Sequence, residues 1–133
     1  MSPMTGMTTT LADTSIWIDA LRSGDSWVHR ALERAEFVAY TEPVLMEFLM
    51  GARTDTERLR LRRFITGGTL LPFDSASDFD AAAAISGIGR RRGLTAGKVD
   101  CLILAVAQRV NAPFVTRDRR QAELAVLVGV PVI

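Results

Sequence analysis

The sequence predicts an α/β fold, a three-layer α/β/α sandwich with a mostly parallel central sheet of four to five strands. Short β-type runs alternate along the chain with longer helical stretches, which is the pattern of strand–helix–strand units. The first four runs are apolar enough to be buried on both faces, as strands of a parallel sheet are. Turn-forming residues separate the elements, so the alternation has clear boundaries.

The N-terminal half contains two expected strands, each followed by two expected helices. The run Thr-Thr-Leu-Ala at 9–12 is a short extended segment that leads directly into an aspartate. The run Phe-Val-Ala-Tyr at 37–40 is aromatic and apolar, and it forms the second expected strand. The helices expected in this half are 15–22, 25–35, 42–52 and 55–66.

The C-terminal half contains the remaining strands, with helices between them. Its expected strands are 70–73, 114–116 and 130–133, and its expected helices are 75–92, 98–110 and 119–127. The separating turns are Gly67-Gly68, Gly93, Asn111-Ala112-Pro113 and Gly129. The acids Asp74, Asp78 and Asp80 near the start of helix 75–92 are expected to serve as helix caps and dipole partners.

Composition predicts one cytoplasmic domain over residues 9–133, preceded by a flexible N-terminus at 1–8. A chain of 133 residues with 48 % hydrophobic and 23 % charged residues is large enough for one core. No apolar run approaches the ~20 residues that span a bilayer, and the first ten residues lack the pattern of a secretion signal. The single cysteine, Cys101, has no partner for a disulfide and no metal-type cysteine or histidine neighbours.

Basic residues are almost all arginine and occur in clusters, although the net charge is only +1. Guanidinium groups bind phosphate in a bidentate way, so such clusters fit nucleic acid or an acidic partner protein. Solvated helix faces explain the same pattern without a ligand. The clusters are Arg58, Arg60, Arg62 and Arg63; Arg90, Arg91 and Arg92; and Arg117, Arg119 and Arg120.

Four acids are candidates for a ligand site, which α/β sheets form at the carboxyl ends of their strands: two follow strands, and two lie on helices that could flank that edge. Asp13 follows the first strand and Asp118 the fourth, Asp100 lies in the first turn of an apolar helix, and Glu47 lies inside another helix. Each aspartate also has a structural explanation. Asp13 and Asp118 can cap helices, and Asp100 can interact with a helix dipole. Glu47 is too far into its helix to cap it.

Taken together, the acids indicate a metal site. Convergent carboxylates repel one another and raise each other's pKa unless a cation joins them. With only one histidine in the chain, an all-oxygen site for Mg²⁺ or Mn²⁺ is expected, which suits phosphodiester chemistry. The neighbouring hydroxyl residues Thr14, Ser15 and Thr116 are expected to orient the acids or a water molecule.

The assembled motifs resemble the PIN-domain family, in particular the VapC-type toxins of bacterial toxin–antitoxin pairs. The resemblance runs from residue 11 to the C-terminus through "LADTSIWIDAL", "TEPVLMEFLMGAR", "VDCLILAVA" and "FVTRDRR". It implies an Mg²⁺- or Mn²⁺-dependent endoribonuclease whose acids are Asp13, Glu47, Asp100 and Asp118. One departure occurs after the fourth acid, where the family often has an aromatic residue and this chain has Gln121.

The resemblance also implies partners: a structured RNA substrate such as tRNA or rRNA, a cognate VapB-type antitoxin, and a second copy in a homodimer. Arg90, Arg91, Arg92 and Arg117 are expected to contact RNA phosphates. Two other functions remain open. A phospho-accepting receiver domain requires adjacent acids after the first strand and a lysine near the last strand, whereas here a single acid, Asp13, follows the first strand and the one lysine, Lys98, precedes a helix. A catalytically silent PIN-like module would bind RNA or protein without cutting.

Overall fold

The computed structural model describes residues 8–34 and 36–133, and its centre is a four-stranded, all-parallel sheet in the order β3-β2-β1-β4. The strands are β1 (Thr9–Ala12), β2 (Phe37–Tyr40), β3 (Thr69–Leu70) and β4 (Phe114–Val115). Leu11 pairs in register with Ala39 on one side and Phe114 on the other. The predicted fold class is confirmed. The expected N-terminal segment 1–8 lies, apart from Thr8, outside the described residues.

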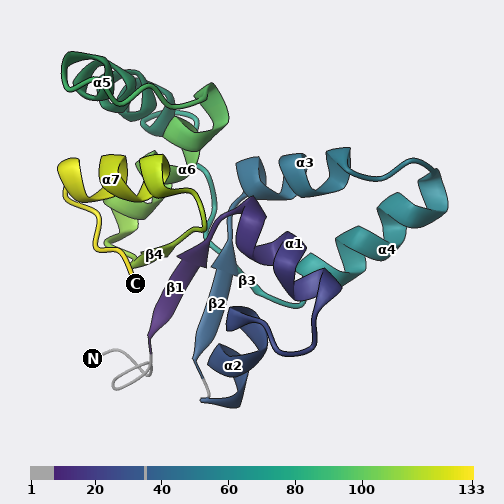
Figure 1. Ribbon diagram of the computed structural model, residues 1–133. Coiled ribbons are helices and arrows are strands. Elements are labelled where there is room, and N and C mark those ends of the chain that lie inside the picture. Colours follow the sequence, from purple (N-terminus) through teal and green to yellow (C-terminus); the bar gives the residue numbers. More distant parts are fainter. Residues whose placement is uncertain (1–7, 35) are drawn as a thin grey trace.

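Within the described residues, seven helices connect the strands and cover the sheet. They are α1 (Thr14–Arg22), α2 (Trp27–Glu33), α3 (Glu42–Met50), α4 (Asp55–Ile65), α5 (Asp78–Arg91), α6 (Lys98–Val110) and α7 (Arg119–Leu127). Figure 1 shows α1 to α4 gathered on one side of the molecule and α5 to α7 on the other. This division follows from right-handed crossovers, because the chain crosses the sheet in one direction from β1 to β3 and returns to β4. No helix within residues 8–34 and 36–133 is long and apolar enough to span a membrane.

The core forms where both helical layers bury apolar side chains against the sheet. Trp17 of α1 makes edge-on contacts with Tyr40 and Phe64, with ring centroids 6.5 and 6.3 Å apart. A Cβ atom at Gly68 would lie 2.8 Å from the Trp17 ring, so this position needs glycine. On the other side, residues 103–107 of α6 are all buried, and burying each large aliphatic side chain stabilises the fold by about 1.5–3 kcal/mol.

The third strand is shorter and the fifth weaker than predicted. Strand β3 ends at Leu70 because Pro72 has no N–H for the ladder and its carbonyl accepts a 2.6 Å hydrogen bond from Arg109 instead. The expected strand 130–133 forms only one isolated parallel bridge, between Val132 and Phe114. That segment follows the turn at Gly129, and its bonds to β4 involve Phe114, whose amide donates to the Pro131 carbonyl and whose carbonyl accepts from the Ile133 amide.

Helices 25–35 and 75–92 both begin later than predicted, and one of the expected caps has another role. Ser26 caps α2 by accepting from the His29 amide, so the helix starts at Trp27. Asp78 is 1 % exposed and forms a bidentate ion pair with Arg109. Arg109 Nε donates to Oδ1 at 2.9 Å, and Nη2 donates to Oδ2 at 2.9 Å. The prediction missed this pair because Asp78 and Arg109 lie on different helices. The pair links α5 to α6, and we call it the Asp78–Arg109 bridge.

Candidate active site

The carboxyl ends of β1 and β4 lie side by side, and the chain leaves them toward opposite faces of the sheet. Strand β1 leads into α1 and strand β4 into α7, so this edge is a switch point of the kind at which α/β sheets bind ligands. The Asp13 amide donates to the Val115 carbonyl at 3.1 Å, which joins the two strand ends just below the site.

Asp13 is 5 % exposed, and hydrogen-bond donors surround its carboxylate. Its Oδ1 accepts from the Ser15 hydroxyl at 2.6 Å and from the Ile16 amide at 3.2 Å, while Oδ2 accepts from the Thr116 hydroxyl. The bond from Ile16 makes Asp13 the N-cap of α1. The carboxylate therefore caps a helix and also faces the site, and Thr116 ties it to the end of β4.

Asp118 is exposed and caps α7. Its Oδ1 accepts from the amides of Arg120 and Gln121 at 2.9 and 3.3 Å. Its own amide donates to Thr116 Oγ1 at 3.0 Å. Thr116 consequently contacts both acids that follow strands, Asp13 through its proton and Asp118 through its oxygen.

Glu47 and Asp100 approach the same edge from two helices. Glu47 is half-buried on α3, and its Oε1 accepts from the Thr14 hydroxyl at 2.7 Å. Asp100 is half-buried in the first turn of α6, which packs against α3. The three hydroxyl residues expected to orient the acids all donate to a carboxylate. Thr14 donates to Glu47, and both Ser15 and Thr116 donate to Asp13.

The four acids share one electrostatic environment, and we call them the acidic edge. Burial, together with the negative charges of Glu47, Asp118 and Asp13, raises the pKa of Asp100 to about 6. Burial also raises the pKa of Asp13, although hydrogen bonds from Ser15 and Thr116 oppose this effect. Each acid is therefore close enough to Asp100 to disfavour its ionised form.

The donor chemistry of the acidic edge fits a hard divalent cation. All candidate ligands are carboxylate oxygens, and a bound cation would relieve the repulsion that raises the pKa of Asp100. Within the described part of the chain, no three histidine, cysteine, aspartate or glutamate side chains are arranged to hold one ion between them. The carboxylate oxygens instead accept from Thr14, Ser15 and Thr116, so a cation would have to compete with these donors.

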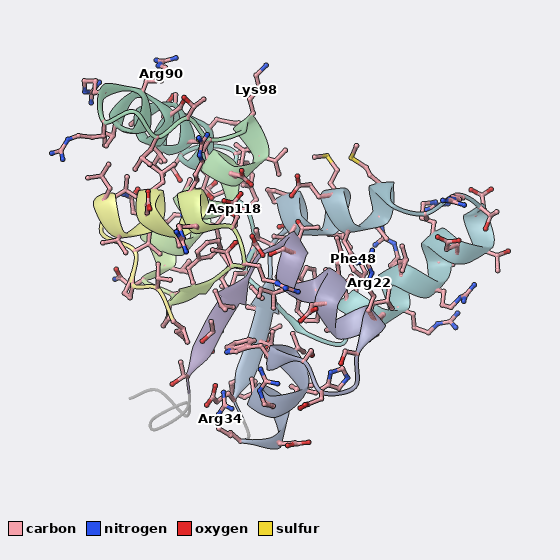
Figure 2. All side chains as sticks on the ribbon, in the orientation of Figure 1. Arg22, Arg34, Phe48, Arg90, Lys98 and Asp118 are labelled. Atoms are coloured by element: carbon pink, nitrogen blue, oxygen red, sulfur yellow. The ribbon has the colours of Figure 1, made fainter. Side chains whose placement is uncertain are left out.

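The arginines predicted to contact RNA are not gathered at the acidic edge. Arg117 follows β4, but its side chain pairs with Asp19 of α1 at 2.8 Å. Arg90, Arg91 and Arg92 are exposed at the end of α5. In Figure 2, Arg90 lies at the outer end of that helix and Asp118 lies near the centre of the molecule.

Sequence reasoning missed one residue of the site, Gln121 on α7. Its side chain is 2 % exposed, and its Oε1 lies 3.2 Å from Thr116 Oγ1. The signal in the sequence was the replacement of an aromatic residue by an amide after the fourth acid, which was interpreted only as a change in local packing.

Comparison with known proteins identifies the family of this chain. The PIN-domain family model matches residues 10–127. The chain is 42 % identical over 114 residues to VapC ribonuclease Mb1587 of Mycobacterium bovis and to ribonuclease VapC11 of Mycobacterium tuberculosis, covering 81 % of this chain and 85 % of each relative.

Solved structures share the fold at lower identity. The VapBC2 complex of Rickettsia felis bound to promoter DNA matches with a TM-score of 0.76 and 17 % identity, covering 95 % of this chain and 98 % of that one. DNA-bound VapBC of Salmonella typhimurium matches with a TM-score of 0.76 and 20 % identity, covering 96 % and 98 %. With its sheet order, its motifs and these relatives, the chain belongs to the PIN-domain family, among the VapC-type toxins.

Proposed function

We propose that this protein is an Mg²⁺- or Mn²⁺-dependent endoribonuclease, the toxin of a VapBC-type pair, which cuts a structured RNA such as tRNA or rRNA. The observation that carries the proposal is the acidic edge, where three other acids raise the proton affinity of Asp100. Such a cluster is costly unless a cation is bound. The ribonuclease names of the 42 % identical relatives support the same activity.

In this proposal Asp13, Asp100 and Asp118, with Glu47 directly or through water, hold the cation. When bound, it would orient the attacking water and offset negative charge on the phosphate. Ser15 and Thr116 hold the Asp13 carboxylate in place, and Thr14 does the same for Glu47. A carboxylate oxygen of the acidic edge accepts the proton of the attacking water. The water oxygen bonds to phosphorus as the bond from phosphorus to the 3′ oxygen breaks, and this 3′ oxygen takes a proton from solvent water, so the products carry a 5′-phosphate and a 3′-hydroxyl.

RNA binding is proposed to rest on phosphate contacts from Arg90, Arg91 and Arg92, together with Arg117. These side chains are exposed, and contacts of this kind add affinity without reading sequence. Arg117 would have to exchange its bond with Asp19 for a phosphate. Binding should therefore weaken steeply as the salt concentration rises.

The proposal includes a cognate antitoxin that inhibits the enzyme and a second copy of the chain. Apolar side chains on the surface support such an assembly. Met46 and Phe79 are 48 % and 57 % exposed and line a hollow of about 280 Å³ between α3, α5 and α6. The solved relatives of Rickettsia felis and Salmonella typhimurium are toxin–antitoxin complexes, which supports the same expectation.

The test is cleavage of total cellular RNA by antitoxin-free protein with Mg²⁺ or Mn²⁺. We expect discrete cuts that end-mapping assigns to one RNA, and their loss with EDTA. Asp13→Asn and Asp100→Asn should each reduce cleavage at least about 100-fold. The matched control is Asp80→Asn, since Asp80 is an exposed aspartate on α5.

Two results would overturn the proposal. One is a folded parent protein that cuts no RNA with either metal, which would favour a silent binding module. The other is cleavage by Asp13→Asn and Asp100→Asn at the rate of the parent. Circular dichroism and melting curves of all variants ensure that lost cleavage does not reflect lost folding.

A further inference from the structure

Gln121 has a buried side-chain amide whose nitrogen lacks a hydrogen-bond acceptor among the described residues. Its carboxamide lies beside Thr116, with Oε1 at 3.2 Å from Thr116 Oγ1. Its Nε2 is fully buried and has no hydrogen-bond partner among the described residues. An unsatisfied buried donor costs about 1–3 kcal/mol, so this arrangement needs an explanation.

The explanation lies in the single proton of the Thr116 hydroxyl. A hydroxyl donates one hydrogen bond and accepts up to two. Asp13 Oδ2 is a buried carboxylate oxygen and accepts that proton, while the Asp118 amide donates to Thr116 Oγ1 at 3.0 Å. A charged acceptor binds a proton donor more strongly than an amide oxygen does. Because Thr116 donates its one hydroxyl proton to the hydrogen bond with Asp13, it has none for Gln121. Thr116 Oγ1 and Gln121 Oε1 would then face each other as two acceptors.

We propose that Gln121 is a positioning residue whose Nε2 donates to Thr116 Oγ1, so that Thr116 in turn donates to Asp13 Oδ2. The two ends of a carboxamide are distinguished by their hydrogen-bond partners, and this orientation pairs the buried donor. Thr116 then has a complete set of partners: it accepts from Gln121 and from the Asp118 amide and donates to Asp13. The buried Oε1 is left without a donor, and unpaired carbonyl oxygens are less rare than unpaired N–H groups.

The consequence is a one-way chain of donors from Gln121 through Thr116 to the Asp13 carboxylate. Because Thr116 cannot rotate its proton away from Asp13, the carboxylate oxygen keeps one orientation toward the site. An aromatic ring at this position could not donate to Thr116. The role rests on the proposed nuclease function, but the hydrogen bond itself does not, so the two can be tested separately.

The hydrogen bond is tested by nuclear magnetic resonance on the metal-free protein, using the side-chain amide signals of Gln121. Thr116→Ser keeps the hydroxyl, whereas Thr116→Val keeps the shape and removes it. We expect hydrogen exchange of the Gln121 amide to match the parent in the serine variant and to be at least about tenfold faster in the valine variant. Gln108, which donates to the Val128 carbonyl at 3.0 Å on the surface, is the internal control and should not change. Equal exchange in both Thr116 variants would overturn the proposal.

The positioning role is tested by a double-mutant cycle between Gln121→Met and Thr116→Val. In the parent, Gln121→Met should weaken Mn²⁺ binding, measured by calorimetry without RNA, and lower kcat, each about 10- to 100-fold, with KM for RNA unchanged. In the Thr116→Val background it should have no further effect, because the two residues act in series. Gln108→Met, the same change on the surface of α6, should leave both quantities unaltered.

The outcomes separate the two proposals. If the parent neither binds Mn²⁺ nor cuts RNA, the nuclease proposal fails, and the exchange experiment still decides the hydrogen bond. If the parent is active but Gln121→Met is unchanged, or its effect adds fully to that of Thr116→Val, the positioning role is wrong. Melting curves must show that Gln121→Met remains folded, which a buried thioether in place of an amide should allow.

Discussion

Two buried aspartates in this protein differ in the charge of their hydrogen-bond donors. Asp78, 1 % exposed, accepts two hydrogen bonds from Arg109 and a third from the Asp74 amide. Asp13, 5 % exposed, accepts from two hydroxyls and one amide. Burial raises the proton affinity of both, but hydrogen bonds from Arg109 and the Asp74 amide, together with the charge of Arg109, more than offset it and lower the pKa of Asp78. At Asp13 the hydrogen bonds offset burial only in part, so the pKa of Asp13 is raised.

The presence or absence of a countercharge from the chain distinguishes structural from functional acids in this fold. At the Asp78–Arg109 bridge the countercharge comes from the chain itself, so the pair stabilises the packing of α5 on α6. At the acidic edge the donors to the carboxylates within the described residues are hydroxyls and amides, and like charges lie near Asp100. The missing countercharge is the physical reason to expect a cation there.

Arg109→Met should have the largest effect on stability of the changes considered for these two regions. This change leaves the Asp78 carboxylate buried without its countercharge, and it should lower the free energy of unfolding by about 3–5 kcal/mol. Urea denaturation at pH 7 measures the effect. The double variant Arg109→Met/Asp78→Leu should recover most of the loss, because it removes the charge that was left unpaired.

The pH dependence of the Asp78–Arg109 bridge has a definite sign. Because the folded pKa of Asp78 is lowered, its contribution is present above the unfolded value of about 3.9 and is lost as pH falls through the folded pKa. A loss of less than 1 kcal/mol for Arg109→Met at pH 7 would contradict this account of the bridge.

The acidic edge should respond in the opposite direction to removal of a charge. The pKa of Asp100 is raised from 3.8 to about 6, so Asp100→Asn should stabilise the metal-free protein at pH 7 by up to about 3 kcal/mol. Below about pH 4 the carboxyl is protonated in both states and the parent bears no cost. The parent therefore loses stability relative to the variant as pH rises from about 4 to about 6. Chemical denaturation in EDTA at several pH values measures this, and a variant less stable than the parent at pH 7 would exclude it.

Added Mn²⁺ should stabilise the acidic edge and have no effect on the bridge. At 100 times its dissociation constant, a ligand that binds only the folded state adds about 2.7 kcal/mol. We expect this shift in the parent and in Asp80→Asn, and its absence in Asp13→Asn and Asp100→Asn. Protons compete with the cation for Asp100, so the affinity should rise between pH 5 and pH 7. Thermal melting with and without the metal tests both statements, and a shift of equal size in all four proteins would indicate binding elsewhere.

The smallest expected effect concerns the hydroxyl donors of the acidic edge. Thr14→Val removes the 2.7 Å hydrogen bond to Glu47, and we expect a loss of about 1 kcal/mol in the free energy of unfolding. The loss is small because Glu47 is only half-buried and water can replace the hydroxyl. A loss as large as that of Arg109→Met would mean that hydroxyls serve as structural partners here, and the contrast between the two regions would fail.

Much of the fold was predictable because it depends on local pattern. Apolar runs at 9–12 and 37–40 are the observed strands β1 and β2, and the alternation with helices predicted the parallel sheet that the structure contains. Where local pattern misled, a contact distant in sequence decided the result. The Pro72 carbonyl after β3 accepts from Arg109 of α6, and the segment 130–133 pairs with β4 at one bridge, between Val132 and Phe114.

The sequence by itself determined which acids precede helices and follow strands, because caps and strand ends are properties of adjacent residues. Only the tertiary structure decided which acid receives a countercharge within the chain, since Asp78 and Arg109 are 31 residues apart. It also decided that Thr116, 103 residues from Asp13, donates to that carboxylate, with the buried Gln121 amide beside it. The physical reason is that desolvation and hydrogen bonding depend on what surrounds a side chain in space.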